Sequence, residues 1–120
     1  MKTLITGILG AMLASAAMAQ SVRVVDGDTL NIAGERVRIM GLDTPETSAR
    51  CQREADLARQ ATAHMRQLVA GGITLRRQGQ DRYGRTLAVV YDARGQDVAR
   101  LMIAAGLARP YGGGRRHGWC

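Results

Sequence analysis

Apolar and polar residues alternate along residues 21–41. Three short runs in this segment are separated by Asp26-Gly27 and Ala33-Gly34. Alternation with a period of two puts successive side chains on opposite faces of a strand, and turn-forming residues between short runs are typical of hairpins. The pattern predicts three short antiparallel strands joined by tight turns. Their inward-facing residues are expected to be Val22, Val24, Leu30, Ile32, Val37 and Ile39.

The period changes between Ser48 and Ala70. Apolar residues in this segment recur at spacings of three and four, and Gly71-Gly72 ends the run. That spacing places them on one face of a helix, and glycine commonly stops a helix at its C-terminus. We therefore expect an amphipathic helix whose buried face comprises Leu57, Ala58, Ala61, Met65, Leu68 and Val69.

Two further strands and a second helix are expected in the remainder of the chain. Residues 73–79 and 85–92 read as strands, bounded by glycine and polar turn residues. Residues 97–106 have a helical spacing of apolar side chains that ends at Gly106. The buried face of this second helix is expected to comprise Val98, Leu101, Met102 and Ala105.

The order of these elements is strand, strand, strand, helix, strand, strand, helix. Five short strands, with one helix between the third and fourth and another after the fifth, suit a five-stranded OB-fold barrel. The fold class is then a β-barrel with helices (α+β). We expect a single domain that ends in a glycine- and arginine-rich tail over residues 111–120, which wraps the surface.

Residues 1–19 have the features of a cleaved secretory signal peptide. Lys2 precedes an apolar run, and Ala-Met-Ala at residues 17–19 fits the small-x-small cleavage pattern. The apolar run is short for a bilayer span, so a retained N-terminal anchor is the weaker alternative. We expect the mature domain to comprise residues 20–120 and to be periplasmic or secreted, without membrane attachment.

Positive charge dominates the chain, which has 17 Lys and Arg against 10 Asp and Glu and a formal net charge of +7. Lys2 would leave with the signal peptide, so every remaining cation is an arginine. Arginine binds phosphate oxygens bidentately, and a compact basic domain attracts polyanions. Nucleic acid is therefore a candidate partner, and a basic surface that is only solvated is the alternative.

Cys51 and Cys120 are the two cysteines of the chain. Thiols of exported proteins are normally oxidised, so we expect a disulfide between them. By restricting the unfolded chain, such a bridge could contribute on the order of 4 kcal/mol. Metal ligation or a free thiol is the alternative, but neither cysteine has another Cys or a His at ligand spacing.

Three polar clusters follow predicted strands: DGDT at residues 26–29, RIMGLDTPE at residues 38–46 and DRYGR at residues 81–85. Each alone has a structural explanation, as a hairpin turn, a helix entry and a polar turn. Together they contain the groups that phosphodiester cleavage needs. A rolled sheet would bring the strand ends, and hence the clusters, onto one rim.

Asp28 and Asp43 are hard oxygen ligands for a divalent cation, which would also explain why two like charges lie close together. Glu46 is a candidate general base for an attacking water. Arg38 and Arg85 can bind phosphate oxygens as negative charge develops on them. These residue types predict metal-assisted hydrolysis of a phosphodiester.

Arg38 and Asp43 would lie on opposite faces of a regular strand, because they are five residues apart. Both can reach one phosphate only if the chain bends at Gly41-Leu42. We expect Gly41 to allow that bend.

The motifs VVDGDTL, RVRIMGLDTPE, DRYGRTLAVVY and GLARPY occur in this order along the chain. They resemble the signatures of the thermonuclease or staphylococcal nuclease-like family, over nearly the whole mature chain. The resemblance implies an OB-fold barrel with helices. It also implies Ca²⁺-dependent hydrolysis of DNA and RNA that cleaves the bond between phosphorus and the 5′ oxygen and leaves 3′-phosphates. The same ligands could accept Mg²⁺ or Mn²⁺.

The resemblance further implies a role for each matching residue. The implied Ca²⁺ ligands are Asp28, Asp43 and the backbone carbonyl of Thr44; the implied catalytic residues are Arg38, Glu46 and Arg85; and the implied substrate-phosphate contacts are Arg82 and Tyr83.

Four other residues are less directly matched. Tyr111 lies near a family tyrosine that lines the nucleotide site, but it aligns only with a gap, so substrate contact and packing of the tail both stay open. His64 and His117 lie away from the three clusters in the sequence, and we expect neither to take part in the chemistry. Trp119 is expected to pack beside the disulfide, with base stacking as the alternative.

The leading hypothesis is an exported, Ca²⁺-dependent nuclease with little sequence specificity, acting as a monomer on DNA or RNA without a stable protein partner. The first alternative is an OB-fold module that binds nucleic acid without cleaving it. The second is a structural domain of the cell envelope, which would have no salt-dependent affinity for oligonucleotides. The complete set of candidate catalytic residues favours the nuclease.

Overall fold

The computed structural model describes residues 21–120 of the chain. The predicted signal peptide, residues 1–19, lies outside the described residues, and its cleavage stays a prediction. The five predicted strands form one sheet in the order β1-β2-β3-β6-β5. Their bounds are β1 (Val22–Asp26), β2 (Thr29–Ile32), β3 (Glu35–Ile39), β5 (Thr74–Gln80) and β6 (Thr86–Tyr91).

Antiparallel pairing joins β1 to β2 and β2 to β3, as predicted, and β5 and β6 form a further antiparallel pair. β3 and β6 pair in parallel, which joins the β1-β2-β3 strands and the β5–β6 hairpin into one sheet. This pairing was not expected. Among residues 21–120, β1 and β5 are the edges of this sheet, so the sheet is not closed. Its five strands and the two helices are compatible with the expected OB-fold barrel, whose closure stays a prediction. Most β5 side chains are exposed, and its pairing is interrupted between Arg77 and Gly79, as befits an edge strand.

Glu35 of β3 helps to hold the edge strand in place. Its carboxylate accepts hydrogen bonds from Thr86 Oγ1 of β6 at 2.8 Å and from Arg77 Nη2 of β5 at 2.7 Å. The bonds from Arg77 and Thr86 lower the pKa of Glu35 to about 2. One side chain thus links three adjacent strands.

Helix α2 (Gln52–Val69) confirms the predicted amphipathic helix but begins later than Ser48. Cys51 is its N-cap in an extended conformation, and its sulfur accepts a hydrogen bond from the Glu54 backbone N–H at 3.4 Å. The Arg50 backbone N–H donates a hydrogen bond to the Glu54 carboxylate at 2.8 Å. The extended conformation of Cys51 ends the helix on this side, and the side chains of Cys51 and Glu54 accept N–H groups near its start that have no helical acceptor. The buried residues of α2 are Glu54, Ala58, Ala61, Thr62, Met65 and Val69.

Helix α3 (Val98–Ala104) is the second predicted helix, and Asp97 caps it by accepting a hydrogen bond from the Ala99 N–H at 2.9 Å. Val98 and Met102 are buried as predicted, and Leu101 is half-buried. Ala105, predicted to be buried, is exposed because the helix ends there. No helix among residues 21–120 is long and apolar enough to cross a membrane.

Two short strands were not predicted. β4 (Gly41–Asp43) and β7 (Arg109–Tyr111) pair antiparallel to form a second, two-stranded sheet. Gly41 has a φ of +94°, a conformation that glycine adopts readily and other residues rarely do. The chain therefore leaves the main sheet after β3 at a sharp bend, which confirms the role expected for Gly41.

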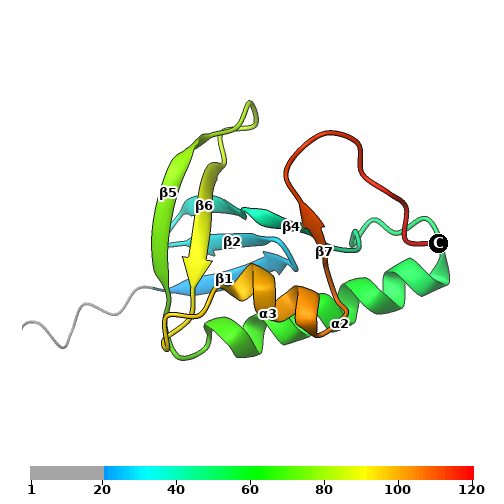
Figure 1. Ribbon diagram of the computed structural model, residues 1–120, viewed down its shortest axis with the longest axis horizontal. Helices are drawn as coiled ribbons and strands as arrows, with labels where there is room; N and C mark the ends of the chain where they lie inside the picture. Colours follow the sequence, from blue (N-terminus) through cyan, green and yellow to red (C-terminus); the bar gives the residue numbers. More distant parts are fainter. Residues whose placement is uncertain (1–20) are drawn as a thin grey trace, which may run out of the picture.

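The tail after β7 returns to the start of α2. Figure 1 shows it rising from the end of β7 and then descending to the N-terminal end of α2. The Cys51–Cys120 disulfide holds it there, with a Cα–Cα separation of 5.9 Å, as the sequence predicted.

The hydrophobic core lies between the main sheet and the two helices, which cover one side of it (Figure 1). It includes the predicted strand residues, of which Val22 is only partly buried. The buried core residues are Val24, Leu30, Ile32, Val37, Ile39, Leu42, Ala61, Met65, Val69, Ala88, Val90, Val98, Ala99, Met102 and Ala108.

Gly27 is required by close packing at the β1–β2 turn. A Cβ at this position would lie 3.0 Å from the Cβ of Ala61 and 3.1 Å from the Cγ2 of Thr44. We expect Gly27→Ala to lower the free energy of unfolding by about 1–3 kcal/mol, because the turn has to move away from α2. Urea unfolding measures this, with Gly112→Ala as control, since no atom lies within 4 Å of a Cβ there. Equal loss in the two variants would contradict the packing argument.

Candidate active site

Two cavities that share Glu46 and Arg116 make up the candidate site. The first, the tail cavity, has a volume of about 580 Å³ and lies between the segment from Asp43 to Glu54 and tail residues 116–120. The second, the strand-end cavity, has a volume of about 360 Å³. Its lining residues are Asp26, Asp28, Thr29, Arg36, Glu46, Tyr83, Arg85 and Arg116.

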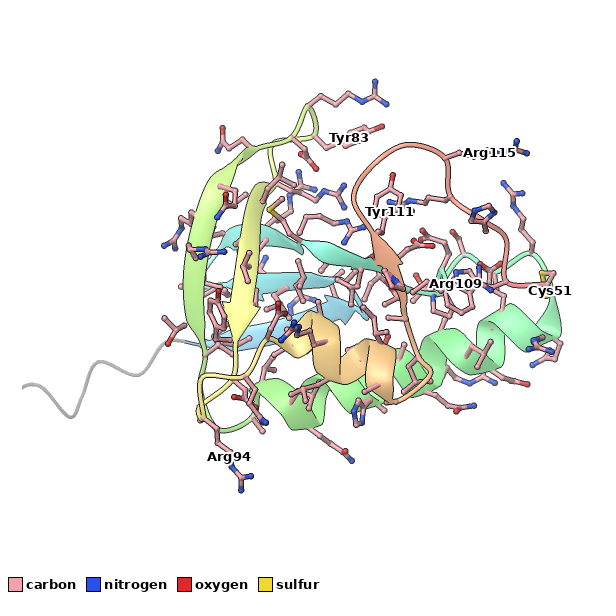
Figure 2. All side chains as sticks on the ribbon, viewed as in Figure 1. Cys51, Tyr83, Arg94, Arg109, Tyr111 and Arg115 are labelled. Carbon is pink, nitrogen blue, oxygen red and sulfur yellow. A yellow bond between two sulfur atoms is a disulfide. The ribbon has the colours of Figure 1, made fainter. Side chains whose placement is uncertain are left out.

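Residues far apart in sequence surround these cavities. Figure 2 shows Tyr83 at the tip of the β5–β6 hairpin, Tyr111 at the end of β7 and Arg115 on the tail that follows β7. The strand-end cavity is lined by residues of all three polar clusters, so the clusters meet at one rim, as predicted. The opposite wall comes from tail residues 116–120, for which the sequence had predicted no role in substrate or metal binding.

Asp28 and Arg38 form a buried pair on adjacent strand ends, with the Arg38 Nη2 to Asp28 Oδ2 distance at 3.6 Å. Arg38 also donates hydrogen bonds to the carbonyl oxygen of Ile39 at 2.6 Å and to that of Leu42 at 3.2 Å. Its guanidinium thus binds both sides of the bend at Gly41. Arg38 lines neither cavity, so a phosphate contact stays a prediction while its support of the bend is visible.

Asp43 and Thr44 lie at the end of β4, where both are buried. The Oδ1 atom of Asp43 is buried without a hydrogen-bond partner, and the nearest cationic atom recorded is Arg116 Nε at 3.6 Å. An unsatisfied buried carboxylate oxygen is costly unless a cation or a donor compensates it. Asp43 is therefore the clearest candidate in the site for binding a positively charged partner.

Glu46 follows in the loop between β4 and α2 and is only half-buried. Its Oε1 accepts a hydrogen bond from Arg116 Nη1 at 2.7 Å, and its backbone N–H donates to the buried Glu54 carboxylate at 3.3 Å. Burial and then the negative charge of Asp28 raise the pKa of Glu46, and Arg116 only partly opposes them. A carboxylate whose pKa is raised in this way is a stronger proton acceptor.

The donor set of the site suits a hard divalent cation. Asp28 and Asp43 supply carboxylate oxygens, and Thr44 lies beside Asp43 with a carbonyl. Within residues 21–120 no group of three or more His, Cys, Asp or Glu is arranged to hold a metal. The predicted ligand set contains only two carboxylates, so it falls outside such a group, and the unpartnered Asp43 oxygen fits a cation.

Arg85 lines the strand-end cavity and is oriented by Asp81. Its Nε donates to Asp81 Oδ2 at 2.7 Å, and the other oxygen of Asp81 accepts the backbone N–H groups of Tyr83 and Arg85, each at 2.9 Å. Arg36 of β3 donates to the carbonyl oxygen of Tyr83 and so ties the hairpin tip to the sheet. The hairpin therefore presents Arg85 on a braced turn.

The predicted substrate contacts differ in position. Tyr83 is 60% exposed and lines the strand-end cavity. The exposed Arg82 lies over the Tyr83 ring, with its Cζ 5.2 Å from the ring centroid, and lines neither cavity. Tyr111 donates its hydroxyl to the carbonyl of Gly114 at 2.7 Å, which is the tail-packing arrangement. A nucleotide contact for Tyr111 stays a prediction.

The tail brings two further residues, His117 and Trp119, to the site. His117 lies away from the clusters in the sequence, but it lines the tail cavity with Asp43 and Glu46, because the disulfide folds the tail back. That it takes no part in the chemistry stays a prediction. Trp119 packs on Arg109, whose Cζ is 3.7 Å from the ring, beside the disulfide as predicted. His64 lies on α2 and lines neither cavity.

Sequence reasoning missed Arg116, Asp26 and Arg36, all of which line the strand-end cavity. Asp26 and Arg36 lie within motifs identified from the sequence but were given no role there. For Arg116 there was one signal, because a pinned Cys120 obliges the preceding arginines to follow the tail back to the domain. The signal was insufficient to choose between Arg115 and Arg116, since neighbouring residues in an irregular segment can point in different directions.

Comparison with known proteins gives a consistent picture. A sequence model of the family described as "Staphylococcal nuclease homologue" matches residues 36–117. The chain is 38% identical over 95 residues to an "Uncharacterized endonuclease" of Escherichia coli, which covers 75% of this chain. It is 35% identical over 95 residues to a "Thermonuclease" of Staphylococcus intermedius, which covers 72%. It is also 33% identical over 119 residues to "Succinoglycan biosynthesis protein ExoI" of Rhizobium meliloti (strain 1021), which covers 86%.

These relatives are longer than the present chain. The matched region spans 58% of the Escherichia coli protein, 55% of the Staphylococcus intermedius protein and 62% of the Rhizobium meliloti protein. The similarity therefore concerns the part of each relative that corresponds to the domain described above.

Replacing Arg38 tests its structural contribution to the site. Arg38→Met removes the partner of buried Asp28 and leaves two backbone carbonyls without their donor. We expect the free energy of unfolding, measured with urea in the presence of chelator, to fall by about 3 kcal/mol. Arg23→Met on the exposed face of β1 is the control and should change it by less than about 0.5 kcal/mol. Unchanged stability of the Arg38 variant would show that the buried contacts contribute little.

Proposed function

Since this chain belongs to the family of staphylococcal nuclease homologues, we propose that it is a nuclease that hydrolyses phosphodiester bonds of DNA or RNA with little sequence specificity. The observation that carries the proposal is the convergence of Asp28, Glu46 and Arg85 on one cavity. A metal-ligating carboxylate, a candidate base and a phosphate-binding cation are the groups that the reaction requires. They come from three separate segments of the chain.

Glu46 is proposed to take a proton from the water that attacks phosphorus. A new bond forms between the water oxygen and phosphorus, and the bond from phosphorus to the 5′ oxygen breaks, with a proton returned to that oxygen from solvent. The products are a 3′-phosphate and a 5′-hydroxyl. A bound divalent cation would supply polarisation of the phosphoryl oxygen and orientation of the water.

Arg85 is proposed to stabilise the charge that develops on the phosphoryl oxygens. The contact of Asp81 with its Nε fixes the plane of the guanidinium, so that the terminal nitrogens can bind two oxygens together. Arg38 is proposed to stabilise the same developing negative charge. It also stabilises the bend at Gly41, after which the chain carries Asp43 and Glu46 to the site. Arg82, Tyr83 and Tyr111 are proposed to contact the flanking substrate.

The proposed cation is Ca²⁺, with Mg²⁺ or Mn²⁺ as alternatives, held by Asp28, Asp43 and the Thr44 carbonyl. The protein is proposed to act as a monomer after export. The Cys51–Cys120 bridge supports an oxidising, extracytoplasmic location, since disulfides are rare in reducing compartments.

Replacing the proposed base is the first test. The purified protein is assayed on single- and double-stranded DNA and RNA with Ca²⁺, Mg²⁺, Mn²⁺ or chelator. We expect Glu46→Gln to lower the cleavage rate by roughly 10²- to 10⁴-fold, because an amide cannot accept the proton. Asp56→Asn on the surface of α2 is the matched control and should cleave at the normal rate.

Full activity of Glu46→Gln would show that another group is the base. If the unaltered protein binds oligonucleotides but cleaves none of these substrates with any of the cations, the non-catalytic binding module replaces the nuclease.

The orientation of Arg85 can be tested through a pair of similar turns. Asp81 and Asp92 each accept two backbone N–H groups through Oδ1, but only Asp81 also binds an arginine Nε. We expect Asp81→Asn to lower kcat by roughly 10- to 100-fold with a smaller change in KM, because Arg85 is no longer held in position. Asp92→Asn removes a similar acidic charge from a similar turn and should leave both constants unchanged. Equal losses in the two variants would attribute the effect to turn stability instead of Arg85.

A further inference from the structure

The carboxylates of the candidate site lie close together. The negative charges of Asp28, Asp26 and Asp43 all act on Glu46 and, together with its burial, raise its pKa. Asp43 is 5% exposed and its Oδ1 lacks a hydrogen bond. Carboxylates placed in this way need a compensating cation, since their mutual repulsion is poorly screened where water is excluded.

Arg116 of the tail is the cation that reaches both carboxylates. Its Nη1 lies 2.7 Å from Glu46 Oε1, and its Nε lies 3.6 Å from Asp43 Oδ1. It lines both cavities, as Glu46 does. Partial burial would lower the pKa of Arg116, but Tyr111 and the carboxylates outweigh this and raise it, so the guanidinium is charged. Arg116 therefore occupies the position where positive charge is most needed.

The tail is held so that Arg116 cannot drift far from this position. The disulfide fixes Cys120 to the start of α2, and Arg109 donates a hydrogen bond to the carbonyl of Gly118 at 3.0 Å. On the other side, the Cζ of Arg116 lies 5.6 Å from the Tyr111 ring. The segment around Arg116 is thus held between Tyr111 and Cys120. This restraint gives the guanidinium a high effective concentration at the carboxylates of Asp43 and Glu46.

We propose that Arg116, tethered by the Cys51–Cys120 disulfide, is the counter-cation of Asp43 and Glu46 in the metal-free protein and competes with a divalent cation for Asp43. The proposal rests on the proposed function in one respect, namely that Asp43 is a metal ligand. When a cation binds, Arg116 leaves Asp43 and releases Glu46. Arg116 therefore acts as an internal ligand of the metal-free form and weakens metal binding by mass action. Because the disulfide holds Arg116 near Asp43, it lowers the apparent metal affinity.

A direct measurement of metal binding tests this without any nuclease assay. Mn²⁺ is titrated into the purified protein in the absence of nucleic acid, and free Mn²⁺ is followed by electron paramagnetic resonance. We expect Arg116→Gln to lower the Kd for Mn²⁺ by roughly 3- to 10-fold, since the competing ion pairs are partly exposed and of moderate strength. Arg115→Gln removes the same charge from the next residue and should leave the Kd within about twofold of the unaltered protein, since no ion pair joins Arg115 to the site among residues 21–120.

Removing the tether gives a second, independent readout. We expect the Cys51→Ser, Cys120→Ser double variant to bind Mn²⁺ more tightly than the unaltered protein. Adding Arg116→Gln to this background should have less effect than it has when the disulfide is present, because the two changes act on one competition. Circular dichroism in chelator verifies that each variant is folded.

The proposal is overturned if Arg116→Gln leaves the Kd unchanged, if Arg115→Gln produces the same shift, or if Mn²⁺ binds to neither protein. An unchanged Kd accompanied by a lower kcat would make Arg116 a phosphate-binding residue instead. If the unaltered protein has no nuclease activity but Arg116→Gln lowers the Kd for Mn²⁺ as expected, the proposed function is contradicted and the competition between Arg116 and the cation is supported.

Discussion

Concentrated negative charge at the strand ends is the constraint around which the rest of the site is organised. Asp28 and Asp43 are buried, and Glu46 lies beside them with a raised pKa. Such a cluster is stable only when positive charge approaches it from within the protein or from a bound cation. Arg38 supplies this charge from β3, and Arg116 supplies it from the tail. Both arginines also make structural contacts, so the fold and the charge balance of the candidate site depend on the same two residues.

Two glycines make this charge cluster geometrically attainable. Gly41 turns the chain out of the main sheet through a positive φ, so that β4 carries Asp43 and Thr44 toward the rim. Gly27 lets the β1–β2 turn lie against Thr44 and Ala61 without a clash, which places Asp28 beside the same rim. The guanidinium of Arg38 then binds carbonyls on both sides of the Gly41 bend. Backbone conformation and side-chain electrostatics therefore act together at one point of the fold.

The disulfide gives the tail a larger part in this protein than its composition suggests. A segment rich in glycine gains little from packing and would lose much conformational entropy if it were held by weak contacts alone. Fixing Cys120 to the N-cap residue of α2 removes much of that cost in advance. The tail can then form one wall of a cavity and bring Arg116 to the carboxylates. The disulfide consequently restricts the unfolded chain and also holds the tail residues that form a wall of the tail cavity.

Local patterns in the sequence determined the five strands of the main sheet, the two helices and the turns between them, because side-chain periodicity and turn residues report short-range geometry. They also indicated the bend at Gly41, and the two cysteines could pair only with each other within the chain. Only the tertiary structure decided the parallel pairing of β3 with β6, the pairing of β4 with β7, and the open edges of the sheet.

The same division holds for the candidate site. The motifs identified Asp28, Asp43, Glu46 and Arg85, since these residues lie at strand ends and turns that local pattern can locate. The burial of Arg38 and the approach of Arg116 to Asp43 and Glu46 could not be inferred, because they depend on how segments distant in sequence pack against one another. Periodicity carries no information about those distances, which arise only when the chain has folded and the disulfide has closed.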